Sequence, residues 1–360
     1  MVSRFAPKPE WLRVRAPGGD RYHTLKQTLR SLDLHTVCEE ARCPNVGECW
    51  REGTMTVMLL GDVCTRGCRF CAVSTGDPRG AVDTREPEHV ARAIAKLELQ
   101  YVVMTMVNRD DLLDGGAEHV ARTVRRLHEL RSDILIETLV GDFRGQNDAI
   151  DACCEGRPDV FAHNVETVRR LTRTVRDVRS GYDQSLAVLA RAKERAREQT
   201  LAALDPSSGP TGSPTGRPML TKSSIMVGLG ETDEEVIETM KDLREVGVDV
   251  VTLGQYLRPS PKHHEVLRFV PPETFEMYAA EAKKMGFLYA ASGPLVRSSY
   301  KAAEVFLRSF LAVDDVEDAL AERLARARVE AARMVAEIAG PISAAPREQL
   351  LPTSSLVRAR

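Results

Sequence analysis

"TVMLLGDVCTRGCRFCAV", residues 56–73, joins an apolar run typical of a buried strand to a loop that carries three cysteines. Cys64, Cys68 and Cys71 follow the spacing C-x3-C-x2-C. A structural zinc site normally takes four protein ligands, so three compact cysteines indicate a metal centre with one position left open. The sequence therefore predicts that this position receives something other than a protein side chain.

The same order of a strand-like run, a polar loop and a helical pattern occurs six times. The six runs are residues 56–60, 101–106, 134–139, 159–162, 223–227 and 249–253. Helical patterns lie between them, and one begins with Thr232 and Glu235 at the spacing of a capping box. Strands alternating with helices predict right-handed βα units and a parallel sheet. Six units fit either an open doubly wound sheet or an incomplete (β/α)6 TIM-type barrel.

Each of the other five runs is followed by a loop rich in charge, amide or glycine. These loops are VNRDDLLDGGA, GDFRG, HNVET, GLGET and QYLRPS. In both candidate folds the C-terminal ends of the strands carry the chemistry. Five such loops on one rim, beside the cysteine loop, predict a polar ligand.

A second cysteine triplet lies upstream, where Cys38, Cys43 and Cys49 follow the spacing C-x4-C-x5-C. Thiolates at these spacings can bind zinc or an iron–sulfur cluster, or form a redox disulfide. Neither triplet forms the paired C-x2-C knuckles typical of zinc. A 4Fe–4S cluster takes four ligands, so three cysteines leave one iron open to substrate or cofactor. Cys153 and Cys154 are adjacent to each other and far from both triplets, and we expect them to be small residues in a helix.

Composition is that of a globular protein, with 43% hydrophobic and 28% charged residues. The 50 basic and 52 acidic residues leave a net charge of −2, which gives no case for nucleic-acid binding. No apolar run approaches the roughly 18 residues that a membrane span needs. The first 20 residues lack the apolar segment of a secretory signal. We therefore expect a reducing compartment, where clustered cysteines bind metal rather than form disulfides.

Four segments are expected along the chain. Residues 1–52 carry the first triplet, 53–291 form the barrel, 292–310 contain the motif RSSY, and 311–360 form a helical extension and tail. Residues 205–218, DPSSGPTGSPTGRP, predict a flexible insertion. Residues 320–338 have the periodicity of an amphipathic helix, expected to pack on the body or to self-associate.

The cysteine loop after the first strand resembles the signature of radical S-adenosylmethionine enzymes. Together with "CEEARCPNVGECW", "NRDDLLDGGAEH", "DVFAHNVETVRRL", "SIMVGLGETDEE" and "ASGPLVRSSY", it resembles the lipoyl synthase family from about residue 8 to residue 300. The resemblance implies a partial barrel with the N-terminal segment folded across its mouth. It also implies insertion of sulfur at C6 and C8 of a protein-bound octanoyl-lysine, started by a 5′-deoxyadenosyl radical.

The resemblance further implies two 4Fe–4S clusters. One is held by Cys64, Cys68 and Cys71 and binds S-adenosylmethionine. The other is an auxiliary cluster and sulfur source, held by Cys38, Cys43, Cys49 and a serine of RSSY, for which Ser299 is favoured over Ser298. The residues implied to contact S-adenosylmethionine or cover the cluster are Phe70, Asp114, Gly115, Gly116, Asn164, Glu166, Gly228, Gly230 and Glu231, with Arg258 or Arg109 for a carboxylate. His263 and His264 are expected to be ordinary surface residues.

The implied partners are octanoylated lipoyl carrier domains of 2-oxoacid dehydrogenase complexes or the glycine cleavage carrier protein. A ferredoxin- or flavodoxin-type electron donor and the iron–sulfur assembly machinery are implied as well. The expected location is the cytoplasm, or the mitochondrial matrix or plastid stroma in a eukaryote. No nucleic acid and no membrane are expected as partners.

Two other functions compete with this interpretation. Another radical sulfur-inserting enzyme, such as one acting on biotin precursors, would lack RSSY together with the first triplet. An electron carrier with two clusters would have eight thiolates in four-plus-four spacing and no polar rim. The chain departs from the family pattern at the insertion, at Met106 and Gly141 where Ser and Pro are common, and in its tail. None of these departures removes a ligand.

Overall fold

A computed structural model describes residues 8–15, 23, 26–27, 36, 43, 45–51, 55–97, 99–204, 217–299, 307, 328–329, 333 and 350–352. The predictions for Cys38, for nearly all of the insertion and for most of the C-terminal extension lie outside these residues.

Seven parallel strands form the central sheet, and their order in the sheet is their order in the chain. They are β2 (Met55–Leu59), β5 (Tyr101–Met106), β6 (Leu135–Leu139), β7 (Val160–Ala162), β8 (Leu220–Val227), β9 (Val250–Gln255) and β10 (Tyr289–Gly293). A doubly wound sheet reverses its strand order at a switch point, and this sheet does not. The fold is therefore the incomplete α/β barrel, with β2 and β10 at its edges.

The six strands predicted from the sequence are confirmed, and β10 is an addition. Its sequence, YAASG, has small residues in place of the branched apolar residues that mark a buried strand. The described strands outside this sheet are β1 (Arg13–Arg15), β3 (Val63–Cys64), β4 (Ser74–Thr75) and β11 (Leu350–Pro352).

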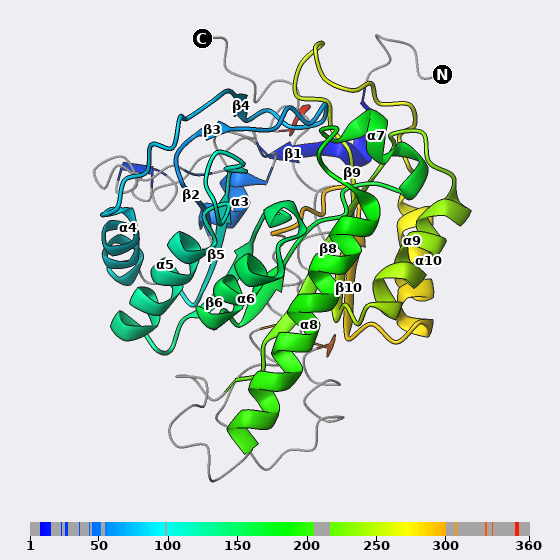
Figure 1. The fold of residues 1–360 in the computed structure, drawn as a ribbon. Helices are drawn as coiled ribbons and strands as arrows, with labels where there is room; N and C mark the ends of the chain where they lie inside the picture. Colours follow the sequence, from blue (N-terminus) through cyan, green and yellow to red (C-terminus); the bar gives the residue numbers. More distant parts are fainter. Residues whose placement is uncertain are drawn as a thin grey trace.

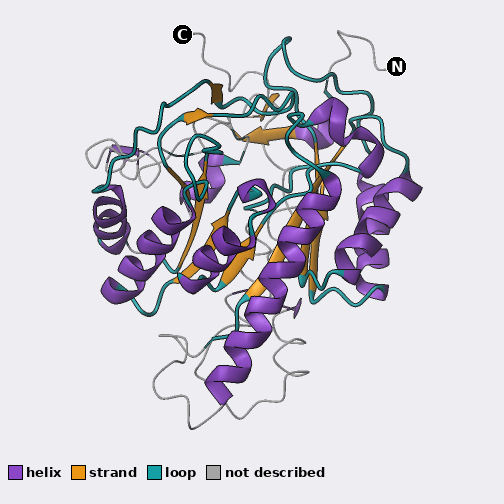
Figure 2. Ribbon diagram, viewed as in Figure 1, coloured by secondary structure: helices purple, strands orange, loops and turns teal. Residues whose placement is uncertain are grey.

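Helices lie along the outer face of the sheet (Figures 1 and 2). The α-helices are α3 (Val46–Arg51), α4 (Glu86–Ala95), α5 (Ala117–Leu130), α6 (Asn147–Glu155), α7 (Thr172–Val175), α8 (Tyr182–Leu204), α9 (Asp233–Glu245) and α10 (Pro272–Lys284). The 3-10 helices are η1 (Glu10–Leu12), η2 (Phe143–Gly145) and η3 (Arg169–Leu171). Helix α9 begins with the predicted capping box of Thr232 and Glu235. Cys153 and Cys154 are buried in α6, as predicted.

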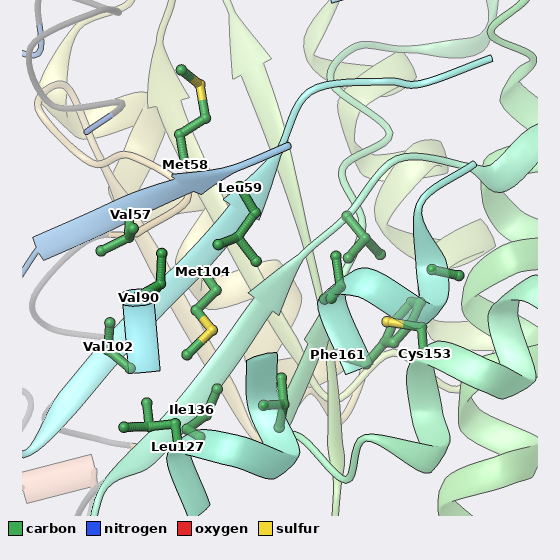
Figure 3. Close-up of a cluster of buried hydrophobic side chains, with 14 of the residues drawn as sticks. Val57, Met58, Leu59, Val90, Val102, Met104, Leu127, Ile136, Cys153 and Phe161 are labelled. Atoms are coloured by element: carbon green, nitrogen blue, oxygen red, sulfur yellow. The ribbon is translucent and has the colours of Figure 1, made fainter. Parts of the chain in front are cut away.

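The main core lies between the sheet and these helices. Val57, Leu59 and Met104 from the strands belong to one buried cluster with Val90 and Leu127 from the helices (Figure 3). Alternate strand residues face the barrel interior, where a smaller cluster contains Val103, Leu135, Val160, Leu220 and Val250. The two faces explain why the strands read as nearly continuous apolar runs.

Two described residues after the RSSY motif contact the barrel. Leu307, in the segment of residues 292–310, is buried in the interior cluster, and Arg328 of the C-terminal extension donates hydrogen bonds to the carbonyls of Phe287 and Leu288. Strand β11 pairs antiparallel with β1, so the tail contributes a strand where only a helix and tail were predicted. Within the described residues, no helix has the length and apolar character to cross a membrane.

Candidate active site

Cys64, Cys68 and Cys71 lie on the segment that follows β2, at the C-terminal rim of the barrel, with Cys64 at the end of the short strand β3. All three are free and half-buried. The Cys64 Sγ accepts a hydrogen bond from the Arg66 N–H at 3.4 Å, and the Cys68 Sγ accepts one from the Asp177 N–H at 3.3 Å. The nearby backbone N–H of Val73 lowers the pKa of the Cys71 thiol, against the larger effect of burial. Backbone donors aimed at sulfur suit bound thiolates, and they tune the potential of an iron–sulfur cluster.

The chemistry of these three thiols fits a cluster better than a single ion. Among the described residues, no three Cys, His, Asp or Glu side chains converge on one metal position. A 4Fe–4S cluster needs no such convergence, because each cysteine binds a different iron. Burial raises the pKa of Cys71 to about 12 and raises that of Cys68, so both need a positive partner to become thiolates. Bound iron ions would supply that charge.

Two loops far along the chain contact the cysteine loop. The Arg69 N–H donates to the Val175 carbonyl at 2.9 Å, and the His264 N–H donates to the Arg69 carbonyl at 2.7 Å. His263 Nε2 lies 2.9 Å from the carbonyl oxygen of Cys71. The expectation that His263 is an ordinary surface residue is therefore wrong. His264 is half-buried, and its side chain stays within its own loop, 2.8 Å from the Glu265 carbonyl.

Asn164 and Glu166 reach the same rim from the end of β7. The Asn164 amide donates to Glu166 Oε1 at 3.2 Å. Burial raises the pKa of the Glu166 carboxyl, which faces Arg176 and lies near enough to Cys68 and Cys71 to raise the pKa of both thiols. Glu166 also has a left-handed φ of 67°, an uncommon conformation for a side chain other than glycine or asparagine. The structure thus brings this predicted pair to the cysteines.

The predicted Asp114, Gly115 and Gly116 form the turn into α5. Asp114 accepts hydrogen bonds from the N–H groups of Gly116 and Glu118, both at 2.9 Å. Gly116 has a φ of 89°, and a Cβ there would lie 2.3 Å from Leu60 Cδ1. The aspartate and glycines are therefore needed for the geometry of the turn itself, independently of any contact with a bound ligand.

The loop after β8 is similar. A Cβ on Gly228 would lie 2.2 Å from Gln255 Nε2, and one on Gly230 would lie 2.8 Å from Leu267. Glu231 accepts hydrogen bonds from the N–H groups of Gly228 and Leu229, so its carboxylate holds its own loop. The peptide backbone is the part of this loop that remains for a ligand.

The two arginines considered for a carboxylate differ in availability. Arg109 is buried and already paired with Asp111 at 2.7 Å, and it also donates to the Ala81 carbonyl at 2.7 Å. It therefore has a structural role. Arg258 donates to the His263 and Pro261 carbonyls and lies 3.8 Å from Glu265. Phe70 is half-buried and packs against the cluster of apolar residues under β8 and β9.

Arg66, between two of the cysteines, is a residue that sequence reasoning missed. Its guanidinium makes paired hydrogen bonds to Asp110 and to Asp142, and a further one to Ser180. Its side chain is 1% exposed. Burial alone would raise the pKa of Asp142, but Arg66 keeps it below its ordinary value. The only signal in the sequence is a charged residue placed between metal-ligand candidates.

The first triplet approaches the RSSY segment through Asn45. Asn45 Nδ2 donates to the Leu295 carbonyl at 2.7 Å, across 250 positions of sequence. Burial raises the pKa of the Cys43 thiol, and the nearby charge of Arg297 opposes that rise. Cys49 lies in α3, on the side that packs against the main core. Two of the three thiols therefore lie on a segment that meets residues just before Ser298 and Ser299, which suits a shared ligand group.

Comparison with known proteins agrees with this geometry. The family model of the radical SAM superfamily matches residues 58–243, and that of the N-terminal domain of lipoyl synthase matches residues 4–43. The fold and the cysteine loop thus define a radical S-adenosylmethionine enzyme. The chain is 68% identical to lipoyl synthase of Sorangium cellulosum, over 99% of this chain and 100% of that relative.

Other relatives are similar over most of their length. Lipoyl synthase of Thermus thermophilus is 52% identical over 84% of this chain and 87% of that protein. The mitochondrial lipoyl synthase of Zygosaccharomyces rouxii is 52% identical over 84% of this chain and 75% of that protein. The chain belongs to the lipoyl synthase family. Its activity is the radical-mediated insertion of sulfur into a protein-bound octanoyl group to form the lipoyl cofactor.

Proposed function

We propose that Cys64, Cys68 and Cys71 hold the 4Fe–4S cluster that binds S-adenosylmethionine. The observation that carries this assignment is the pair of backbone N–H groups, from Arg66 and Asp177, that donate to the sulfurs of Cys64 and Cys68. When bound, the reduced cluster supplies the electron that cleaves S-adenosylmethionine into methionine and a 5′-deoxyadenosyl radical. The residues of the chain position the ligands and exclude water. Tight positioning matters because an unactivated C–H bond carries no charge that a protein group could bind.

We assign the S-adenosylmethionine contacts to two groups of residues. Asn164 and Glu166 offer an amide and a carboxylate to the ribose hydroxyls or the amino group. The turn of Asp114, Gly115 and Gly116 and the loop of Gly228, Gly230 and Glu231 supply mostly backbone at the rim. Arg258 offers its guanidinium to a carboxylate. Phe70 covers the cluster. Arg109 is no longer a candidate for the carboxylate, because Asp111 already occupies its guanidinium.

We further propose that Cys38, Cys43, Cys49 and Ser299 hold an auxiliary 4Fe–4S cluster that supplies the sulfur. The hydrogen bond between Asn45 and Leu295 supports the meeting of the two chain segments. Alkoxide is a harder and weaker partner for this iron than thiolate, so a serine ligand is suited to release as the cluster is consumed. Residues 1–52 and 292–310 would then act together as one functional unit beside the barrel of residues 53–291.

The substrate carriers in this proposal are octanoylated lipoyl domains of 2-oxoacid dehydrogenase complexes or the glycine cleavage carrier protein. A ferredoxin- or flavodoxin-type protein supplies electrons, and the iron–sulfur assembly machinery loads both clusters. A cytoplasmic location is favoured because the relative with 68% identity is bacterial, whereas the mitochondrial relative has 52% identity.

Two triple variants test the division of roles. Alanine at Cys64, Cys68 and Cys71 should abolish S-adenosylmethionine cleavage while the protein keeps about half its iron, one cluster of two. Alanine at Cys38, Cys43 and Cys49 should leave reductive cleavage intact and stop sulfur insertion. Equal loss of cleavage in both variants, with the fold retained, would show that the roles are not divided in this way.

A further inference from the structure

His263 connects the loop after β9 to the cysteine loop through a directed pair of hydrogen bonds. Its Nε2 lies 2.9 Å from the Cys71 carbonyl oxygen, and its Nδ1 lies 2.8 Å from Ser260 Oγ. His263 and Cys71 are 192 positions apart in sequence.

The partners fix the tautomer of the imidazole. A carbonyl oxygen can only accept, so Nε2 carries the hydrogen and donates it to Cys71. The Nδ1 of the neutral ring then has a lone pair, which accepts the Ser260 hydroxyl hydrogen. Ser260 Oγ in turn lies 3.4 Å from the Lys262 N–H, from which it accepts. These contacts form one hydrogen-bond chain that ends on the Cys71 peptide.

That chain completes the immobilisation of the Cys71 backbone. The Cys71 N–H donates to the Cys68 carbonyl at 3.1 Å, which holds the peptide group before Cys71. His263 holds the peptide group after it. With both flanking peptide groups held, the φ and ψ of Cys71 are fixed, and they determine the direction of its Cα–Cβ bond. The position of the sulfur then depends on one remaining torsion.

We propose that His263, oriented by Ser260, is a positioning residue that directs the Cys71 sulfur toward the cluster. This inference depends on the proposed function, in which Cys71 is a cluster ligand. Loss of a group that orients a metal ligand through a hydrogen bond typically costs about 10- to 100-fold in metal affinity or activity. His263 therefore stabilises the bound cluster and sets its potential without touching iron or substrate.

His264 provides a matched control. It lies next in the chain, and its main-chain N–H holds the Arg69 carbonyl at 2.7 Å. Its ring makes an edge contact with Tyr256, with 6.4 Å between centroids, and Nδ1 stays within the loop. Replacing the His264 side chain leaves the backbone contact in place, so it tests whether a histidine side chain in this loop matters in general.

The experiment compares His263→Ala, His263→Gln, Ser260→Ala and His264→Ala as anaerobically reconstituted holoenzymes. The rate of iron loss to a chelator and the midpoint potential of the EPR signal that changes on adding S-adenosylmethionine are measured for each. His263→Ala should lose that cluster about tenfold faster and shift its potential. Gln should restore much of the retention, because its amide can still donate to Cys71. Ser260→Ala should lie between, and His264→Ala should match the wild type.

Three results would overturn the inference. One is wild-type retention and potential in a folded His263→Ala. Another is equal loss in His264→Ala, which would assign the effect to loop packing. The third concerns Ser260→Ala, which decides the test if His263→Ala does not fold. This variant removes the hydrogen bond to Nδ1 and leaves the imidazole in place. Wild-type retention and potential in Ser260→Ala would show that the hydrogen bonds from Ser260 through His263 to Cys71 do not act together. If the EPR signal of the wild-type protein does not change on adding S-adenosylmethionine, the proposed function is rejected, and this inference with it.

Discussion

The guanidinium of Arg66 makes two hydrogen bonds to the carboxylate of Asp142, at 2.6 and 2.7 Å, although the residues are 76 positions apart. A second carboxylate, Asp110, binds its other edge at 2.8 and 2.9 Å. Arg66 lies in the cysteine loop after β2, Asp110 in the loop after β5 and Asp142 in the loop after β6. One side chain therefore ties together three loops of the rim where the cluster is proposed to bind.

Arg66→Lys should separate these loops, because an ammonium cannot bind two carboxylates edge-on. We expect faster cluster loss, an activity about 10- to 100-fold lower, and a free energy of unfolding reduced by up to about 3 kcal/mol. Iron content, turnover and urea unfolding measure these effects. Arg92→Lys is the control, because Arg92 makes an exposed ion pair with Glu88 on α4 and should change nothing measurable. Equal behaviour of the two variants would show that the paired geometry is unimportant.

The parts of the site that local patterns encode can be predicted from the sequence. The apolar run before Cys64, the spacing of the cysteines and the polar loops at 108–117 and 163–167 are enough to locate the rim. The Arg66 pairs and the His263 contact cannot be predicted in this way, because they join residues 44 to 192 positions apart. Strand β10 escapes prediction because its small, mostly half-buried residues lack the branched apolar signal of a buried strand, and pairing with β9 rather than propensity selects the strand.

Gly254→Ala should interfere with sulfur insertion more than with S-adenosylmethionine cleavage. A Cβ there would lie 2.0 Å from the Val296 carbonyl oxygen, so the backbone before Ser298 and Ser299 must move. A shift of about 1 Å in a reacting group can cost about a hundredfold in rate. Cleavage depends chiefly on the cysteine loop after β2, which Val296 does not belong to, and should stay within a few-fold.

The two yields, 5′-deoxyadenosine and lipoyl product, are measured on the same samples. Gly293→Ala is the graded control, because its Cβ would meet only a side-chain methyl of Val296 at 3.3 Å. Parallel loss of both products in Gly254→Ala would point to general damage to the barrel instead.

Lys222 and Glu137 form an ion pair inside the barrel, with Nζ and Oε2 2.6 Å apart and side chains 2% and 0% exposed. The hydroxyl of Tyr101 donates to the same oxygen. Lys222→Met leaves a buried carboxylate without its cation and should lower the free energy of unfolding by about 3–5 kcal/mol. Adding Glu137→Gln removes the charge and should recover part of that loss. Urea unfolding of the three proteins tests this, and purely additive losses would contradict it.

His128 should make stability depend on pH. Burial lowers its pKa from 6.5 to about 4, and its Nε2 lies 3.2 Å from the Arg157 carbonyl. Between these values the unfolded chain binds the proton and the folded chain does not. The contribution is therefore complete above pH 6.5 and is lost as pH falls, by about 2 kcal/mol between pH 7 and pH 5.

His128→Gln removes this titration and keeps a donor for the carbonyl. Asp159, whose pKa burial raises to about 6, has the opposite dependence but is present in both proteins and cancels in the difference. Urea unfolding at several pH values gives that difference. Parallel curves for the wild type and the variant would show that His128 has the same pKa in the folded and the unfolded chain, against this prediction.

The proposed fourth ligand of the auxiliary cluster is tested at Ser299. Ser299→Ala should still cleave S-adenosylmethionine but form little or no lipoyl product, because the cluster loses the ligand that closes it. Ser299→Cys should keep a stable cluster, since thiolate binds iron more strongly, and should slow the second sulfur transfer. Mass spectrometry of an octanoyl-lysyl peptide after anaerobic reaction, with Mössbauer spectra of both variants, measures product and cluster.

Ser298→Ala is the internal control and should be milder. Both serines are half-buried and follow Leu295, which Asn45 holds at 2.7 Å, so either could approach the first triplet. Replacing the serine that binds iron should change the Mössbauer spectrum of the auxiliary cluster. Replacing the other serine should not, because its hydroxyl does not bind iron. Full product from Ser299→Ala with none from Ser298→Ala would move the assignment one residue back. Normal product from both variants would reject a serine ligand, and the meeting of Asn45 with Leu295 would then be a packing contact.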